Sequence, residues 1–166
     1  MHLGNTLFTI AGLVLLSTIT LSLNTSILQN HVVLLQSEQI LEGIALAQKY
    51  IEEAEACRYD EDGSATIPGS FTYAASFGPD DNEVYPYFDD IDDFDDFSTT
   101  IVSGTIPYQV DIEVDYVNDY SPDQPTTSRT YFKRMQVSIS SPFLSTLASH
   151  KLVLKRMFAF HYFYSE

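Results

Sequence analysis

The sequence is poor in basic residues. It holds 8 Lys and Arg against 23 Asp and Glu, a formal net charge of -15 at pH 7 over 166 residues. Residues 59–128 contain no Lys or Arg at all. Because nucleic acid binding depends on Lys and Arg contacts to phosphate groups, this composition argues against a nucleic acid partner. The same charge argues against binding to anionic lipid headgroups.

Residues that carry common catalytic chemistry are also scarce. The single Cys57 permits no disulfide within the chain. The four histidines, His2, His31, His150 and His161, form no His-x-x-x-His or Cys-His group that would indicate zinc or an activated nucleophile. The sequence also lacks a Gly-rich phosphate loop and a Gly-x-Ser-x-Gly turn. We therefore expect a protein that is not an enzyme and that needs no cofactor.

Charge is missing from the N-terminal segment. Residues 7–23 (LFTIAGLVLLSTITLSL) are uncharged, and the first charged residue is Glu38. This stretch is long enough to span a bilayer as a helix. A signal peptide would carry a basic leading region and a cleavage site followed by a break, whereas here the helical pattern continues. Its Ser and Thr residues suit close packing between helices, although a single-pass anchor in lipid is the simpler alternative.

The pattern becomes amphipathic after residue 35. Apolar residues recur at steps of three and four, which predicts one buried helix face formed by Ile40, Ile44, Ala47, Ile51 and Ala54. With no Pro to interrupt it, the helix is expected over residues 5–56, a length of about 75 Å. The roughly one hundred remaining residues, one domain in size, cannot bury so long a helix. Its first half must therefore contact lipid or other copies of the chain.

The C-terminal part reads as an antiparallel sheet. Residues 108–116 alternate without a break between apolar and polar side chains, as expected for a half-buried strand. Residues 130–140 predict a second strand that pairs with the first as a hairpin, across a connection at 118–125. Residues 152–164 predict a third strand, with a bulge at Arg156, and residues 70–77 predict a short one.

The polar positions of these strands suggest ion pairs. Asp111, Glu113 and Asp115 lie on the outer face of the first strand. Opposite charges on neighbouring antiparallel strands attract one another. We expect these acids to face basic residues on the outer side of the sheet, namely Lys133, Lys151 or Lys155.

Residues 88–97 form an acidic repeat, FDDIDDFDDF. An apolar residue at every third position fits a 3₁₀-like turn better than an α-helix. We expect Phe88, Ile91, Phe94 and Phe97 to anchor the segment on one face, and the six Asp to point to solvent.

Two interpretations of the repeat stay open. The first is a solvated acidic face. The second is a Ca²⁺ site, because calcium takes six to eight oxygen ligands, although the spacing is not that of an EF-hand loop. The candidate ligands are Asp89, Asp90, Asp92, Asp93, Asp95 and Asp96.

The whole arrangement resembles the type IV pilin-like superfamily. In that family a prepilin peptidase cuts after a Gly, and the mature chain begins with a Thr-Leu pair at its second and third positions and a Glu at its fifth, followed by a hydrophobic half-helix. Here Gly4 precedes Asn5-Thr6-Leu7-Phe8-Thr9. Thr9 stands in place of the glutamate if cleavage follows Gly4, and Asn5 does so if the mature chain begins at Met1. The acidic repeat is also similar to a Phe-Asp-Asp-Ile-Asp-Asp-aromatic stretch of some pilin-like proteins.

The resemblance implies an α+β fold in which a long N-terminal helix packs by its second half on a small antiparallel sheet. Residues 1–35 would be the hydrophobic half-helix, 36–57 the amphipathic half and 58–166 the acidic head, with a loop at 78–104. Gly4 and Asn5 would be the processing site. Assembly would use the apolar residues Leu7, Phe8, Ile10, Leu13, Val14, Leu15, Leu16, Ile19, Leu21 and Leu23.

The implied function is that of a structural subunit of an extracellular pilus-like filament. Its partners would be other copies of the chain, inner-membrane lipid before assembly, and a pilus or secretion assembly machinery. It would lie in the inner membrane first and in a cell-surface filament afterwards. The alternatives are a minor pilin or a type II secretion pseudopilin that primes assembly, and a monomeric membrane-anchored domain that binds Ca²⁺ or another ligand.

Overall fold

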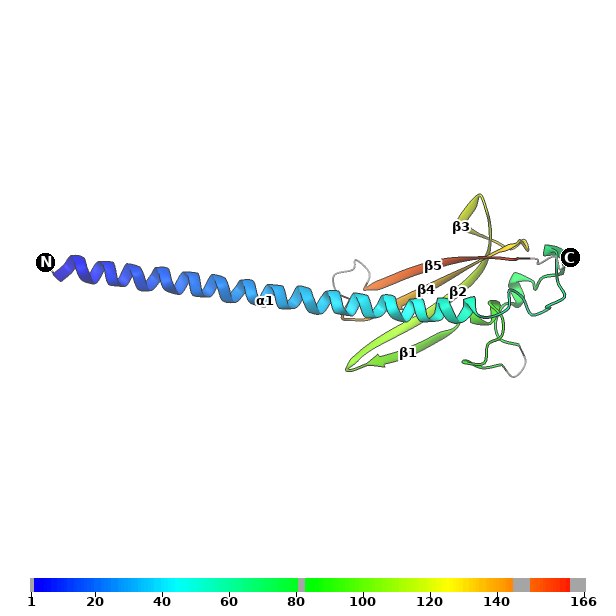
Figure 1. Ribbon diagram of the computed structural model, residues 1–166, viewed down its shortest axis with the longest axis horizontal. Coiled ribbons are helices and arrows are strands. Elements are labelled where there is room, and N and C mark those ends of the chain that lie inside the picture. Colours follow the sequence, from blue (N-terminus) through cyan, green and yellow to red (C-terminus); the bar gives the residue numbers. More distant parts are fainter. Residues whose placement is uncertain (1, 81–82, 145–149, 162–166) are drawn as a thin grey trace. The chain divides into compact units, whose positions relative to one another are not determined.

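The fold combines one long helix with a five-stranded antiparallel sheet (Figure 1). The computed structural model describes residues 2–80, 83–144 and 150–161. The chain divides into two compact units, Met1–Gln39 and Ile40–Glu166. The expected α+β class, with a long N-terminal helix and an antiparallel sheet, is confirmed.

Helix α1 covers His2–Glu55, 54 residues without interruption. The expected helix over residues 5–56 is therefore confirmed to within a few residues at each end. No Pro occurs before Pro68, so every peptide N–H in the helix interior is able to donate. The helix closes with two tight turns, in which the amide of Ala56 donates to Glu53 O and that of Cys57 to Ala54 O.

The sheet has the strand order β1-β2-β4-β5, and all of its pairings are antiparallel. β2 is the longest strand and pairs with three others, because β3 binds the end of the same edge that β1 occupies. The strands are β1 (Ser98–Ser103), β2 (Ile106–Asn118), β3 (Ser121–Thr126), β4 (Phe132–Ser140) and β5 (Lys151–Ala159).

The two strands with clear alternation are confirmed as β2 and β4, which pair directly from Gln109 with Ser140 to Tyr116 with Lys133. The hairpin between them is not simple, because the expected connection contains β3. β1 lies inside the segment that was expected to be a loop. Both missed strands lack a buried face, so neither carries the hydrophobic alternation that marks a strand in sequence.

The short strand expected at residues 70–77 is wrong. This segment holds the 3₁₀ turns η1 (Pro68–Ser70) and η2 (Ala74–Ser76). Its aromatic residue Phe71 is fully buried, which explains the apolar pattern. The amide of Thr72 donates to the Asp60 carboxylate rather than to a neighbouring strand.

The bulge expected at Arg156 is also wrong. β5 pairs with β4 in unbroken register from Lys151 to Ala159. Arg156 keeps its place on the apolar face of the strand and its guanidinium binds the carboxylate of Glu55, at the end of α1. Residues 162–164 of the expected strand lie outside the described residues.

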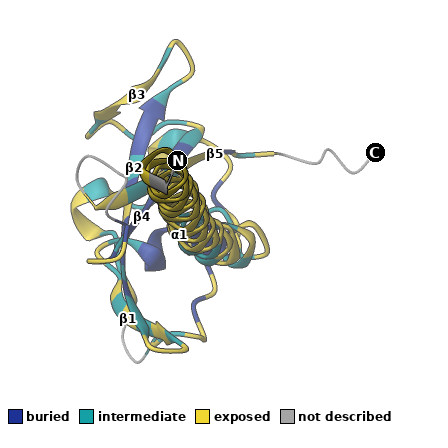
Figure 2. Cartoon of the chain, turned by 90° about the vertical axis from the view of Figure 1, so that its left-hand side faces the viewer, coloured by how far each residue is buried: buried dark blue, intermediate teal, exposed yellow. Residues whose placement is uncertain are grey.

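The core lies between α1 and the sheet (Figure 2). The five expected inward residues of β2 are all buried, namely Tyr108, Val110, Ile112, Val114 and Tyr116. The first four pack with Met135, Val137 and Ile139 of β4 and with the buried face of α1, whereas Tyr116 packs in a second cluster with Ala65 and Phe71.

Ala47 and Ala54 form the centre of that helix face and are fully buried. Ile40, Ile44 and Ile51 are half-buried at its border. Tyr50 and Gly43, which the stripe did not include, are buried too. A Cβ at Gly43 would lie 3.6 Å from side-chain atoms of Ile139 and Leu152, so the helix approaches β4 and β5 closely there.

This packing leaves little room for larger residues at position 47. We expect Ala47→Leu to lower the free energy of unfolding of the head by about 1–3 kcal/mol, because added methylenes in a filled core force neighbours to move. Ala45→Leu, the same change on the exposed face of the same turn, should alter it by about 0.5 kcal/mol or less. Urea denaturation of the full chain in detergent measures both free energies of unfolding, with the near-UV circular dichroism of the tyrosines as the signal. Equal effects would contradict the packing described.

Candidate functional site

The first unit presents an apolar helix surface. The ten residues expected to mediate assembly are all exposed, from 49% at Ile19 to 81% at Phe8. The apolar surface continues through Ile27 and Leu28 to residues 32–35. By length and composition, α1 could cross a membrane. A continuous apolar surface of this extent marks a site of contact with lipid or protein.

The hydroxyl groups in this unit are engaged with the helix itself. Thr9 Oγ1 donates to Thr6 O at 2.8 Å, Thr18 Oγ1 to Leu15 O at 2.8 Å and Thr20 Oγ1 to Leu16 O at 2.8 Å. A hydroxyl that is already bonded loses little when water is removed from it. The Thr residues therefore do not prevent burial of this surface in lipid or against another helix.

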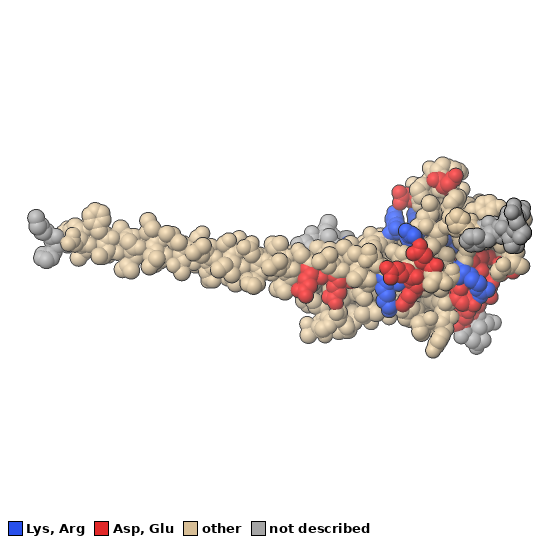
Figure 3. Space-filling view, in the orientation of Figure 1, with Lys and Arg blue, Asp and Glu red and all other residues tan. Residues whose placement is uncertain are grey.

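Charged side chains gather on the second unit (Figure 3). Residues 3–37 carry no Asp, Glu, Lys or Arg. Gly4 and Asn5, the expected processing site, lie within α1 and are exposed. A Cβ at Gly4 would meet no other atom within 4 Å. Packing within the chain therefore gives no reason for a glycine at this position.

The second unit holds a buried lysine. Lys133 lies two residues before Met135 on β4, so its side chain is on the same inner face of the sheet, and it is 0% exposed. Its Nζ donates to Tyr59 O at 2.6 Å, to Asp60 Oδ1 at 3.2 Å and to the carboxylate of Asp92. Asp60 and Asp92 are buried as well. The lysine thus joins β4 to the segment after α1 and to the acidic repeat.

Aromatic rings complete the surroundings of the ammonium group. Nζ lies 4.7 Å from the ring centroid of Tyr59, 5.1 Å from that of Phe77 and 5.7 Å from that of Tyr116. Such cation–π contacts are stronger in sites that exclude water. The pocket is apolar except for the carboxylates and one carbonyl, so each charge in it depends on the others.

This arrangement corrects the expected ion pairs. Lys133 does not face the outer acids of β2, because its register places it opposite Tyr116 on the inner side. On the outer side Asp115 pairs with Arg134, and Glu113 accepts a hydrogen bond from Gln136 at 3.0 Å. Lys155 binds Asp123 in β3 at 2.8 Å.

The acidic repeat folds inward more than expected. Phe88, Ile91 and Phe94 are buried and Phe97 is half-buried, and all four pack in the main core. The expected 3₁₀ turn is present as η3 (Asp92–Phe94). The six Asp do not all point to solvent, however. Three of them are buried, namely Asp90, Asp92 and Asp93.

Backbone amides explain two of the buried carboxylates. Asp90 Oδ1 accepts from the amides of Asp92 (2.9 Å) and Asp93 (3.2 Å), the first two residues of η3. Asp93 Oδ2 accepts from the amides of Asp89 (2.9 Å) and Asp90 (3.1 Å). Asp side chains commonly satisfy nearby amides in turns, a signal that the repeat carried in its sequence.

Burial raises the pKa of Asp90 to about 9, and the charge of Asp92 and a side-chain hydrogen bond to Asp92 act in the same direction. Asp90 is therefore a neutral acid near pH 7. Burial also raises the pKa of Asp92, and the charge of Lys133 opposes that rise. The pKa values of Tyr59 and Tyr116 are raised mainly by burial, so both phenols remain protonated.

The six Asp do not converge on one metal position. Asp92 binds Lys133, and Asp95 Oδ1 accepts from the amide of Val114 at 2.8 Å. Asp96 is exposed with φ of 55°.

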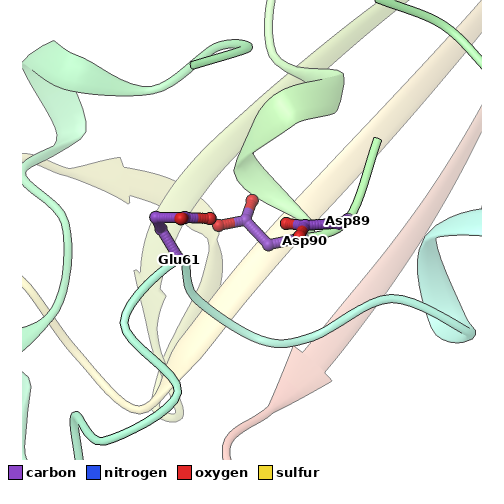
Figure 4. A group of neighbouring side chains, drawn as sticks. All are labelled: Glu61, Asp89 and Asp90. Atoms are coloured by element: carbon purple, nitrogen blue, oxygen red, sulfur yellow. The ribbon is translucent and has the colours of Figure 1, made fainter. Parts of the chain in front are cut away.

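Among the described residues, two groups of carboxylates each have oxygens within 4.8 Å of one another. One contains Glu61, Asp89 and Asp90 (Figure 4), and the other Glu83, Asp89 and Asp93. Arg58 binds Asp89 and lies 3.6 Å from Glu61, so a cation would have to displace it. The Ca²⁺ site in the repeat stays a prediction, and of its six expected ligands Asp89, Asp90 and Asp93 belong to these two groups.

The buried acid predicts an unusual pH dependence. Asp90 keeps its proton in the folded chain up to about pH 9, whereas an unfolded Asp loses it near pH 3.9. The unfolded state thus binds fewer protons between these values. The free energy of unfolding should fall as pH rises through this window, by at most ~1.4 kcal/mol per pH unit from this group.

Asp90→Asn keeps the Oδ1 acceptor for the two amides but has no proton to lose. Urea denaturation at pH 5, 6.5 and 8 should therefore show a shallower fall of stability with pH for this variant than for the original chain. Asp96→Asn makes the same change at an exposed position of the same repeat and should leave the slope as it was. Parallel slopes for Asp90→Asn and the original chain would show that Asp90 ionises normally.

Comparison with known proteins does not assign the chain to a family, since no family model, curated protein or solved structure matches it.

Proposed function

We propose that this chain is a structural subunit of a pilus-like filament, held in the inner membrane by the first half of α1 before assembly. The observation that carries the proposal is the exposed, uncharged helix surface of the first unit, joined by one continuous helix to a folded β head. A surface of this kind is stable only when lipid or other helices cover it.

The length of that surface favours assembly over simple anchoring. A helix over the uncharged residues 3–37 is about 50 Å long, whereas the hydrocarbon core of a bilayer is about 30 Å thick. The excess finds no use in a single-pass anchor. In a bundle of sister helices the whole length can be covered, and bonded hydroxyls and small residues suit such close packing.

The head has the properties of a filament surface. Charged residues gather on it (Figure 3), and the sheet forms a hydrophobic core with the second half of α1, so it does not depend on assembly to fold. The resemblance to pilin-like proteins supports the same function. Secretion through the inner membrane and display at the cell surface follow from the proposal.

A pair of valines tests the role of the helix surface. Val14 in the first unit and Val102 in β1 are similarly exposed, at 59% and 65%. Val14→Asp should remove the chain from fibres sheared off expressing cells, because a charge in an apolar helix surface costs roughly 2.5–3.5 kcal/mol in lipid and is as unfavourable between helices. Val102→Asp should leave the chain in those fibres. Electron microscopy and immunoblotting of the sheared fraction measure the outcome.

Three other results would change the assignment. Fibres that persist unchanged after deletion of the gene would make the chain a minor or priming subunit. If the unsubstituted protein were monomeric in detergent and absent from the sheared fibre fraction, the result would instead favour a membrane-anchored binding domain. Equal loss of both valine variants would contradict the specific role of the helix.

The resemblance also predicts processing at the N-terminus. Mass spectrometry of the chain from fibres should find an N-terminus at Asn5, produced by cleavage after Gly4. Gly4→Leu should block this cleavage and leave the chain in the membrane fraction. An intact Met1 on fibre-borne chains would show that assembly proceeds without the expected peptidase step.

A further inference from the structure

Lys133 and its acids form a constellation that the proposed function does not use. An amine and a carboxyl group are in contact inside a pocket from which water is excluded. A second carboxyl, Asp90, is 1% exposed and adjoins the first, because its Oδ1 accepts from the backbone amide of Asp92 at 2.9 Å. Amide formation between Lys and Asp side chains requires these three parts: a nucleophile, an acyl acceptor and a group that moves protons between them.

We propose that Lys133 and Asp92 condense into an intramolecular isopeptide bond, with Asp90 as the proton-transfer residue. The bond would join β4 to η3 across 41 residues of sequence. No external reagent is required, because the lysine and the carboxyl group contain every atom of the product and of the water that leaves.

The first step is a proton transfer within the ion pair. The ammonium of Lys133 gives one proton to Asp92, which leaves a neutral amine and a carboxylic acid. In water the charged forms are strongly preferred, but desolvation in an apolar pocket disfavours both charges and brings the neutral pair close in energy. The rings of Tyr59, Phe77 and Tyr116 supply that apolar pocket.

The amine then attacks Cγ of Asp92, and a C–N bond forms. The carbonyl oxygen takes up the electron pair, and in the proposed mechanism the Asp90 carboxyl donates a hydrogen bond to it. One further proton passes from the nitrogen through Asp90 to the hydroxyl group of Asp92. The C–O bond breaks, water leaves and the amide remains. No group is oxidised or reduced.

Asp60 is the other carboxylate near Nζ, and its environment favours a different role. Its oxygens accept from the amide of Thr72 at 3.0 and 3.2 Å, which holds it on the segment after α1. Nζ lies 3.2 Å from Asp60 Oδ1 and is in closer contact with Asp92. After condensation Asp60 would accept the N–H of the new amide, so the buried nitrogen would keep a partner.

Peptide mapping of the full chain tests the bond. The protein is purified in detergent, unfolded, and digested with trypsin and a glutamate-specific protease. Cleavage after Glu61, Glu83 and Glu113 separates Asp60 (residues 59–61) from Asp92 (residues 84–113). Trypsin cannot cut after an acylated lysine, so the expected product is peptide 84–113 joined to peptide 130–134, lighter by one water than their sum.

This map distinguishes the alternatives. Recovery of free peptide 130–133 in full yield would overturn the proposal and leave Lys133 as a buried ion pair. A link from 130–134 to 59–61 would overturn the assignment of Asp92. Loss of water within peptide 62–83, which contains Asp62-Gly63, would report an unrelated cyclisation at that site. If this loss were found together with free peptide 130–133, the result would count against the isopeptide bond.

Variants assign the roles. Lys133→Arg should abolish the linked peptide, whereas Lys155→Arg, at the exposed pair with Asp123, should retain it in full. Asp90→Asn preserves the acceptor oxygen but cannot transfer protons, so it should leave the head folded and reduce the linked fraction at least tenfold. If the linked peptide formed as completely in Asp90→Asn as in the original chain, Asp90 would have no part in the mechanism. If Lys133→Arg fails to fold, the map of the original chain still decides.

Discussion

The position of Lys133 determines how the second unit closes. Its ammonium has no contact with solvent, and its partners come from the two segments that follow α1. Removing one partner from a buried ion pair is costly, about 3–5 kcal/mol, because the other charge is left without compensation. The segment after the helix and the acidic repeat are therefore held against β4 by a contact that neither can give up alone.

The number of acids around this lysine constrains their protonation. Two carboxylates, Asp60 and Asp92, face one cation, so a third buried anion nearby would have no partner. Asp90 resolves the conflict by keeping its proton, at a pKa of about 9. Asp93 is stabilised differently, because two backbone amides donate to one of its oxygens. A segment with six Asp in eight residues can thus be partly buried without six buried charges.

The sequence was sufficient for the parts of the fold that depend on local periodicity. The uncharged and amphipathic halves of α1 and the alternation in β2 and β4 each mark a buried or apolar face directly. β1 and β3 have no such face, so only their pairing with β2 makes them strands.

The buried lysine illustrates why the candidate site was harder to predict. Lys133 shares the inward parity of Met135, which was visible in the sequence, but its carboxylate partners lie 41 and 73 residues away. No periodicity connects residues at such distances. The burial of Asp residues in the repeat was not predicted for the same reason. The spacing of the repeat predicted its turn, but it gave no sign of the distant cation that stabilises Asp92.

The free energies involved also limit how such a chain could leave a membrane. The ten exposed apolar residues of the proposed assembly surface would each be stabilised by burial by about 1.5–3 kcal/mol, and so together by roughly 15–30 kcal/mol. A domain of the size of the head is stable by only about 5–15 kcal/mol. Pulling on the head to move the helix from lipid into water would therefore unfold the head first.

Transfer of the helix directly from lipid to sister helices avoids this cost, because the apolar surface is never exposed to water. For the proposed filament, the absence of charge before Glu38 would serve the transfer from lipid as well as the packing of the assembled helices. A glutamate near the start of the helix could help to position an incoming subunit, but neither Asn5 nor Thr9 carries a charge. In the proposed filament, register would accordingly come from shape, through the small and hydroxyl side chains of the helix, or from contacts between the acidic heads.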